Sequence, residues 1–237
     1  MPSRRSILVG MTAAALLPRN AFAAEVSAQS LLARAIARAG GARALENARV
    51  LAWSGKAIVY TGDKPIHLGV RTEVEPFSYA RTDTWILGQT PPDKRSLIVE
   101  GDGGHALRNG APLPLPATLF HHEREQFSLY GLMRLVSLRD PGVSLALLPR
   151  TDGRMGLKVA HPSAPPTTLY FDDRGGLIGA ENVVDSPDGK TKIPQQIDFS
   201  GRIVGAGVRW PRSLRIRQNG APYFDLTLTS FTPRRVR

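Results

Sequence analysis

The sequence predicts a mainly β protein of the α+β class. Its expected architecture is a curved antiparallel sheet, an unclosed half-barrel of about eleven strands, with an N-terminal helix and an inserted helix covering the concave face. Three observations lead to this fold. Apolar residues alternate with polar ones along most of the chain, turns rich in Gly, Asn or Asp separate these stretches, and only two stretches follow the helical period. Such closely spaced turns are typical of an antiparallel meander.

The composition fits a globular chain and excludes several classes of site. The chain has 237 residues, of which 42% are hydrophobic, and this is too apolar for a disordered protein. It contains no cysteine, so disulfides, thiolate zinc sites, iron–sulfur clusters and cysteine nucleophiles are excluded. We expect residues 24–237 to form a single domain, because a chain of this size can bury roughly 70% of its unfolded surface in one core.

Residues 1–23 have the features of a cleaved signal peptide. A basic start containing Arg4 and Arg5 precedes the apolar stretch 7–17, and Ala23 completes a small-x-small cleavage pattern. The apolar stretch would span only about 16 Å as a helix, roughly half of a hydrocarbon core, so it does not predict a permanent anchor. The paired arginines resemble a twin-arginine export signal, and an ordinary secretory signal is the alternative. Either signal predicts a periplasmic protein.

The charge of the exported protein is moderately positive. The whole chain carries a formal +11, and cleavage after residue 23 would remove three arginines and no acid, leaving +8. This charge suits contact with a membrane surface that bears anionic headgroups. Export argues against a nucleic acid as partner. We expect a monomer.

The two helical stretches lie far apart in the sequence. Residues 26–39 place Leu32 and Ile36 on one apolar face, and a glycine pair follows. The second helix is predicted over residues 118–138, where an Asp-Pro-Gly turn ends it. Its apolar stripe includes Phe127, Tyr130 and Met133, which we expect to act as a lid over the sheet.

The strand pattern is clearest just after the first helix. Residues 66–74 alternate strictly between apolar and polar side chains, which predicts a strand with one buried face. Farther along, Phe77 and Trp85 are an even number of residues apart, so both would lie on one face of the next predicted strand. Charged residues interrupt the apolar pattern of that face. Seven further strands are predicted between residues 143 and 232.

This layout resembles the periplasmic lipoprotein-carrier (LolA/LolB-like) superfamily. Residues 39–45 resemble the passage from helix to first strand in members of that superfamily. Residues 169–178 resemble their hairpin with Phe-Asp before Gly-Leu, and residues 199–214 resemble the Gly-x-x-x-Pro start of their terminal hairpin. The resemblance covers most of residues 25–232 and implies an open half-barrel around a cavity for a hydrophobic ligand such as a lipid or an acylated protein. The chain has no lipidated cysteine, and no functional residue is carried over.

A strongly curved sheet of this many strands needs helices or a ligand to fill its concave face. Four large apolar residues on predicted strands are candidates for lining such a cavity, namely Trp53, Phe77, Trp85 and Trp210. The alternative is that they pack the core beneath the helices.

Two polar clusters offer other functions. His121 and His122 lie three or four residues before Glu125, a spacing that could supply two metal ligands from a helix, although no further ligand is identifiable. Arg209, Arg215 and Arg217 share one parity of a predicted strand and could contact anionic groups, the alternative being a solvated sheet face. The common nucleophile-elbow, P-loop and dinucleotide-binding motifs are absent from the sequence.

The leading hypothesis is therefore a non-enzymatic periplasmic carrier or chaperone for a hydrophobic ligand, with no catalytic residues, metal or cofactor. An envelope scaffold that docks through a basic C-terminal face is the second hypothesis. A metal-dependent hydrolase that uses His121 and His122, or a protein whose cofactor explains twin-arginine export, is the third.

Overall fold

Thirteen antiparallel strands form one strongly curved sheet in the computed structural model, which describes residues 27–61 and 64–235. Their order across the sheet is β6-β5-β4-β3-β2-β1-β15-β14-β11-β10-β9-β8-β7, so β6 and β7 are free edges and the sheet is not closed. The first strands are β1 (Leu51–Val59), β2 (Ile66–Glu75), β3 (Tyr79–Ile86), β4 (Arg95–Glu100), β5 (Gly103–Arg108) and β6 (Ala111–Leu113). The later strands are β7 (Ser144–Leu147), β8 (Met155–His161), β9 (Ala164–Phe171), β10 (Leu177–Asp185), β11 (Lys192–Ser200), β14 (Ser213–Gln218) and β15 (Ala221–Phe231).

The first and last strands meet in the middle of the sheet. β1 pairs with β2 on one side and with β15 on the other, and Trp53 lies opposite Phe231. The register between β1 and β15 shifts at Ser54 and Gly55. A Cβ atom on Gly55 would lie 2.5 Å from the carbonyl oxygen of Thr227, so this close approach of the two backbones requires glycine. The pairing joins the N-terminal and C-terminal meanders into one surface.

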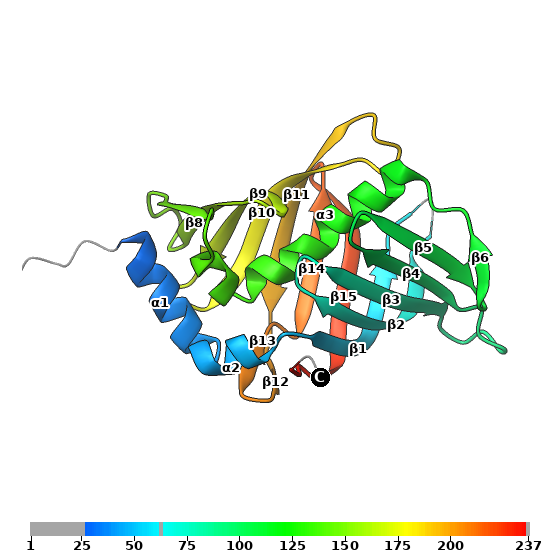
Figure 1. The fold of residues 1–237 in the computed structure, drawn as a ribbon, viewed down its shortest axis with the longest axis horizontal. Helices are drawn as coiled ribbons and strands as arrows, with labels where there is room; N and C mark the ends of the chain where they lie inside the picture. Colours follow the sequence, from blue (N-terminus) through cyan, green and yellow to red (C-terminus); the bar gives the residue numbers. More distant parts are fainter. Residues whose placement is uncertain (1–26, 62–63, 236–237) are drawn as a thin grey trace, which may run out of the picture.

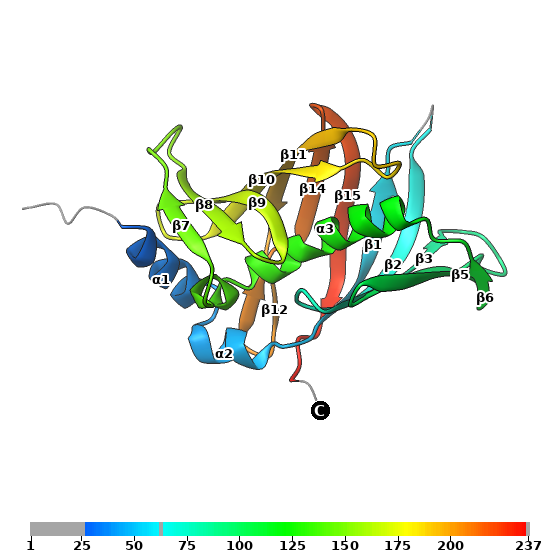
Figure 2. The same ribbon diagram turned by 45° about the horizontal axis from the view of Figure 1, so that its top comes forward.

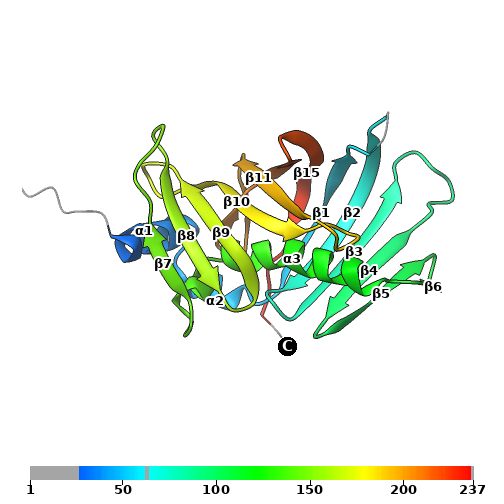
Figure 3. The same ribbon diagram turned by 90° about the horizontal axis from the view of Figure 1, so that it is seen from above.

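The main helix lies across the concave side of this sheet. α3 (Ala117–Met133) runs diagonally from the β5 end to the β8 end, as Figures 1 and 2 show. Seen from above in Figure 3, strands lie on both sides of it. The expected half-barrel with an inserted helix is therefore confirmed. The helix is shorter than the predicted span 118–138, because the backbone turns at Leu135, with φ +62°, and continues as the 3-10 turn η1 (Val136–Arg139).

The N-terminal helix packs at one end of the same core. α1 (Ala28–Arg38) lies beside β7 and the following short helix α2 (Ala42–Asn47), as seen in Figure 2. Ser27 and Ser30 cap its start reciprocally, each side chain accepting from the other residue's backbone N–H. Its apolar face buries Leu31 and Ile36 against the sheet. The predicted signal peptide, residues 1–23, lies outside the described residues. None of the helices in the described ranges is both long enough and apolar enough to cross a membrane.

Two expectations about the strands are wrong. The single strand predicted to carry Arg209, Arg215 and Arg217 is divided near Pro211. Its first part, β13 (Val208–Trp210), pairs with β12 (Ile203–Gly205) in a separate small sheet, and its second part is β14 of the main sheet. In β3, the face that carries Trp85 does not point toward the core. Ala80 and Thr82 point inward, and Trp85 packs over Gly69 on the opposite face of the sheet. Small side chains on the inner face leave room for α3.

Candidate functional site

An apolar cavity of about 230 Å³ lies between α3 and the concave face of the sheet; we call it the α3 cavity. Five neighbouring strands, β3, β2, β1, β15 and β14, form its floor, and the middle of α3 forms its roof. The floor residues are Trp53, Val59, Leu68, Val70, Thr72, Thr82, Thr84, Leu214, Ile216, Tyr223, Phe224 and Leu226. Most of them alternate along their strands with residues of the outer face, so the period of two in the sequence gathers them here. Tyr223 and Phe224 are the exception, because the pairing of β14 with β15 is irregular beside them.

The roof of the α3 cavity carries aromatic side chains. Phe127 and Tyr130 point into it from α3, and the ring centroid of Tyr130 lies 4.7 Å from that of Trp53 on the floor. This contact closes one end of the cavity. At Gly131, α3 comes close to the turn between β2 and β3, where a Cβ atom would collide with the ring of Phe77. The helix therefore shields an apolar space that the sheet alone would expose.

One carboxyl group faces this apolar space. Glu123 lines the α3 cavity, and no hydrogen bond joins its carboxyl to the described part of the chain. Burial raises the pKa of Glu123, and the neighbouring His122 offsets this only in part. Burial likewise raises the pKa of Tyr130 and of Tyr223, and the charge that Glu123 would carry adds to both shifts. All three groups therefore favour their neutral forms, in which each can donate a hydrogen bond.

His122 and Glu125 fasten α3 to the end of β10. The Nδ1 atom of His122 lies 2.5 Å from the carbonyl oxygen of Asp185, so it donates to that oxygen, and the Glu125 carboxylate accepts from the Asp185 backbone N–H at 2.6 Å. His122 is fully buried, whereas His121 is exposed and packs edge-on against Phe120. In the described residues no three His, Asp or Glu side chains gather as metal ligands. The histidine pair is therefore divided, and its buried member holds the helix in place.

Glutamine in place of Glu123 is expected to stabilise the protein at neutral pH. An unfolded chain ionises this carboxyl near its ordinary pKa of 4.5, while the folded protein keeps it protonated to higher pH. Stability therefore falls as the pH rises from 4.5 to the raised pKa, by about 1.4 kcal/mol for each pH unit in that window. Glu123→Gln should remove this fall.

Urea unfolding of wild type and Glu123→Gln across the range from acid to neutral pH measures the effect. Glu100→Gln is the matched control, because Glu100 is exposed at the end of β4. Equal stabilities of the two variants at neutral pH would contradict the raised pKa of Glu123.

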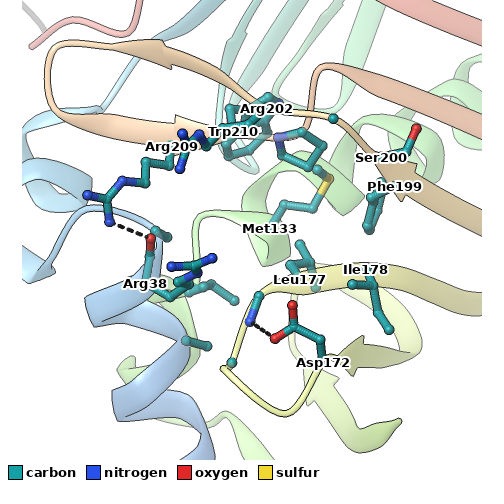
Figure 4. A pocket seen from close by; sticks show the side chains of 17 residues that line it. Arg38, Met133, Asp172, Leu177, Ile178, Phe199, Ser200, Arg202, Arg209 and Trp210 are labelled. Carbon is teal, nitrogen blue, oxygen red and sulfur yellow. Dashed lines mark hydrogen bonds between the residues drawn. The ribbon is translucent and has the colours of Figure 1, made fainter. Parts of the chain in front are cut away.

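A second, wider pocket of about 460 Å³ lies at the α1 end of the molecule. Figure 4 shows Arg38 from α1, Arg202 from the loop after β11 and Arg209 from β13 around it. We call it the arginine pocket. Its apolar wall includes Leu177 and Trp210.

The three arginines give this pocket a net positive charge. None of them forms an ion pair within the described ranges, although Arg209 donates to the carbonyl oxygen of Arg38 at 3.1 Å. Asp172 is the one acid in the lining, and its carboxylate accepts from the backbone N–H groups of Arg174 and Gly176. The arrangement suits an anionic group that has apolar surface beside it.

The α3 cavity and the arginine pocket adjoin the same narrow gap. This gap, of only about 10 Å³, is lined by Trp53 and Tyr130, which also line the α3 cavity. Met133, Trp210 and Pro211 line both the gap and the arginine pocket. The gap therefore lies between the two spaces.

The candidate lining residues from the sequence are distributed over several places. Trp53 lines the α3 cavity, as do the roof residues described above, whereas Trp210 and Met133 line the arginine pocket. Phe77 lies in the turn between β2 and β3, where its ring stacks on His161 at 4.1 Å. Trp85 is on the outer face. The structure thus brings Trp53 together with the helix but separates it from Phe77 and Trp85.

The expected arginine cluster is also divided. Arg215 and Arg217 lie on the outer face of β14, where they pair with Asp225 and Asp198 at 3.5 and 3.2 Å. Arg209 lies on β13 and faces the arginine pocket instead. The shared parity of the three in the sequence was misleading, because the strand is interrupted near Pro211.

Sequence reasoning missed Glu123, Arg38 and Arg202. Glu123 lies among other charged residues of α3, and only its spacing of four and seven residues from Phe127 and Tyr130 placed it on the apolar stripe. Arg38 and Arg202 belong to elements far apart in the chain, so no local pattern joins them.

Comparison with known proteins supports the fold. No protein-family model matches the sequence, and no curated protein does. Among solved structures, the LolA superfamily protein NE2245 from Nitrosomonas europaea matches with a TM-score of 0.56 at 13% identity, over 90% of this chain and 96% of that one. A putative outer membrane lipoprotein-sorting protein domain from Vibrio parahaemolyticus matches with a TM-score of 0.51 at 8% identity, over 84% and 91%. The chain therefore has a LolA-like fold, as the resemblance in the sequence implied.

Proposed function

We propose that this protein is a non-enzymatic carrier or chaperone that holds a hydrophobic ligand, such as a lipid or the acyl chains of a lipoprotein, in the α3 cavity. The observation that carries the proposal is the apolar cavity enclosed between a single helix and a curved sheet. The likeness to a LolA superfamily protein and to a lipoprotein-sorting domain supports it. Residues 1–23 support export, so the proposed place of action is the periplasm.

Binding would be driven by burial of apolar surface. Each buried methylene group contributes roughly 0.8 kcal/mol, so a few carbons of one acyl chain suffice for measurable affinity. The α3 cavity, at about 230 Å³, is smaller than the roughly 300–1,000 Å³ of most small-molecule sites. A larger ligand therefore requires α3 to move outward. The gap at Trp53 and Tyr130 is where such a movement would extend the cavity.

Native mass spectrometry of protein purified gently from an exporting host tests this proposal. We expect a discrete added mass that organic solvent extracts and that fragments as a lipid. A bare protein mass that persists when lipids are added back would contradict a carrier function. Metal analysis of the same sample tests the hydrolase hypothesis, for which stoichiometric metal lost on His122→Ala would be required.

The arginine pocket favours contact with a membrane as part of this function. Its three arginines lie at the end of the gap that leads to the α3 cavity, which is where an anionic lipid headgroup would be held while the chains pass inward. A scaffold that docks on an acidic protein through the same arginines is the second candidate function. Salt-sensitive binding of a protein, with no extractable lipid, would favour the scaffold.

A further inference from the structure

We propose that the hairpin of β12 and β13 inserts its uncharged tip into an anionic lipid bilayer, while the arginines beside the tip bind the phosphate groups of the lipids. This inference rests on the proposed function, because it specifies how the protein would meet a membrane. It starts from the sequence of the hairpin. Residues 203–208 are Ile-Val-Gly-Ala-Gly-Val, without a charged or polar side chain, and Arg202 and Arg209 lie directly before and after them.

The two faces of the hairpin have different surroundings. On the inner face, Val208 is fully buried and Trp210 stacks on Phe231, with ring centroids 5.3 Å apart. Val204 lies on the outer face, directly opposite Arg209 in the pairing of the two strands. It is 57% exposed, which makes it the most exposed large apolar side chain of the described residues. Single aliphatic residues are common on protein surfaces, but this one lies beside arginines.

The hairpin is held in a fixed place at the surface. The backbone N–H of Arg209 donates to the carbonyl oxygen of Ala39 at 2.8 Å, and its guanidinium donates to that of Arg38 at 3.1 Å. These bonds fasten the hairpin to the end of α1, and in Figure 1 its tip reaches past α2 at the lower edge of the molecule. A guanidinium has five N–H donors, so the bond to Arg38 leaves others for a phosphate. An ordered tip also loses little conformational freedom when it inserts.

The charge around the hairpin is complementary to an anionic surface. α1, α2 and residues 201–212 together contain six arginines and one acid, Glu46. None of the six arginines forms an ion pair within the described residues. The adjoining arginine pocket adds one acid, Asp172, whose carboxylate already accepts from two backbone N–H groups.

The combination of charge and apolar surface favours a bilayer over other anionic partners. Arginine binds phosphate oxygens strongly, and a soluble phosphate or an acidic protein would satisfy the arginines alone. Either of these partners would leave Val204 in water. A bilayer offers anionic groups at its surface and an apolar interior directly beneath them, so it satisfies the arginines and the tip together.

A single dye can report insertion, because the chain contains no cysteine. Val204→Cys provides one thiol for an environment-sensitive nitrobenzoxadiazole label. Val183→Cys is the matched control, since Val183 is 46% exposed on β10, two residues before the Asp185 carbonyl that binds α3. With vesicles of equal parts phosphatidylglycerol and phosphatidylcholine, we expect the dye at position 204 to shift to the blue and to be quenched by nitroxides on the lipid tails. The dye at position 183 should do neither, and vesicles of phosphatidylcholine alone should give no shift.

Val204→Ser measures the contribution of the tip without a dye. We expect about fivefold weaker binding to the same anionic vesicles, which corresponds to about 1 kcal/mol. This ratio should persist in high salt, because salt screens the arginine contacts but not the burial of apolar surface. Val183→Ser should bind as wild type does.

Three results would overturn the inference. A dye at position 204 that stays in water while the protein binds vesicles would limit the contact to headgroups, and equal shifts at both positions would mean adsorption without orientation. A response to soluble polyglutamate but not to vesicles would favour an acidic protein as the partner. In each case native mass spectrometry decides the carrier function separately, because lipid in the α3 cavity does not depend on the hairpin. A bare protein whose hairpin inserts would overturn the carrier function and support the membrane contact.

Discussion

Replacing Thr84 with tryptophan is expected to abolish loading of the α3 cavity while the protein stays folded. Thr84 is a half-buried residue of β3, and its side chain points into the cavity. No hydrogen bond in the described residues depends on its hydroxyl group. An indole ring at this position would occupy much of the 230 Å³ that a ligand needs. We expect ligand affinity to fall more than tenfold, which corresponds to a loss of about 1.4 kcal/mol or more.

The measurement is calorimetric titration with monolauroylglycerol, together with native mass spectrometry of the protein as purified. Thr227→Trp is the matched control, because Thr227 is exposed on β15 and faces away from the cavity. Overfilling a packed space commonly costs 1–3 kcal/mol, so urea unfolding should accompany the binding data. Unchanged binding by a folded Thr84→Trp protein would show that the ligand lies elsewhere.

Neutralising the arginine pocket is expected to weaken binding to anionic vesicles by about a hundredfold. Arg38, Arg202 and Arg209 form no ion pairs in the described chain, so their charges are available to headgroups. Each basic residue near an anionic membrane surface contributes about 1 kcal/mol. Replacing all three with glutamine should therefore remove about 3 kcal/mol. Cosedimentation with vesicles that contain phosphatidylglycerol measures the loss.

Arg215→Gln with Arg217→Gln is the control for total charge. Both arginines pair with aspartates on the outer face of β14, so we expect their replacement to cost far less. The difference between the two sets should shrink in high salt, which screens exposed charges. If both sets weakened vesicle binding equally for each charge removed, the pocket would have no special role. Normal vesicle binding by the triple variant would exclude the pocket as a membrane contact.

The sequence by itself determined the class of fold and the position of most elements. Strict alternation over residues 66–74 marks β2, since apolar side chains two residues apart must share one face of a strand. A three-to-four-residue period marks α1 and α3, and Phe127 and Tyr130 lie on the face of α3 that covers the sheet. These features depend on neighbours close in the chain, which is why local periodicity is enough to find them.

Tertiary structure alone decided which faces and residues meet. Thr82 and Thr84 lie on the inner face of β3, where their small side chains leave room for α3, while Trp85 packs over Gly69 on the outer face. Tyr223 lines the α3 cavity only because β15 returns to the middle of the sheet. The arginine pocket likewise joins Arg38 of α1 to Arg202 and Arg209, which follow it by more than a hundred residues of chain. Such contacts depend on strand order and on the path of a helix across the sheet, and neither leaves a periodic trace in the sequence.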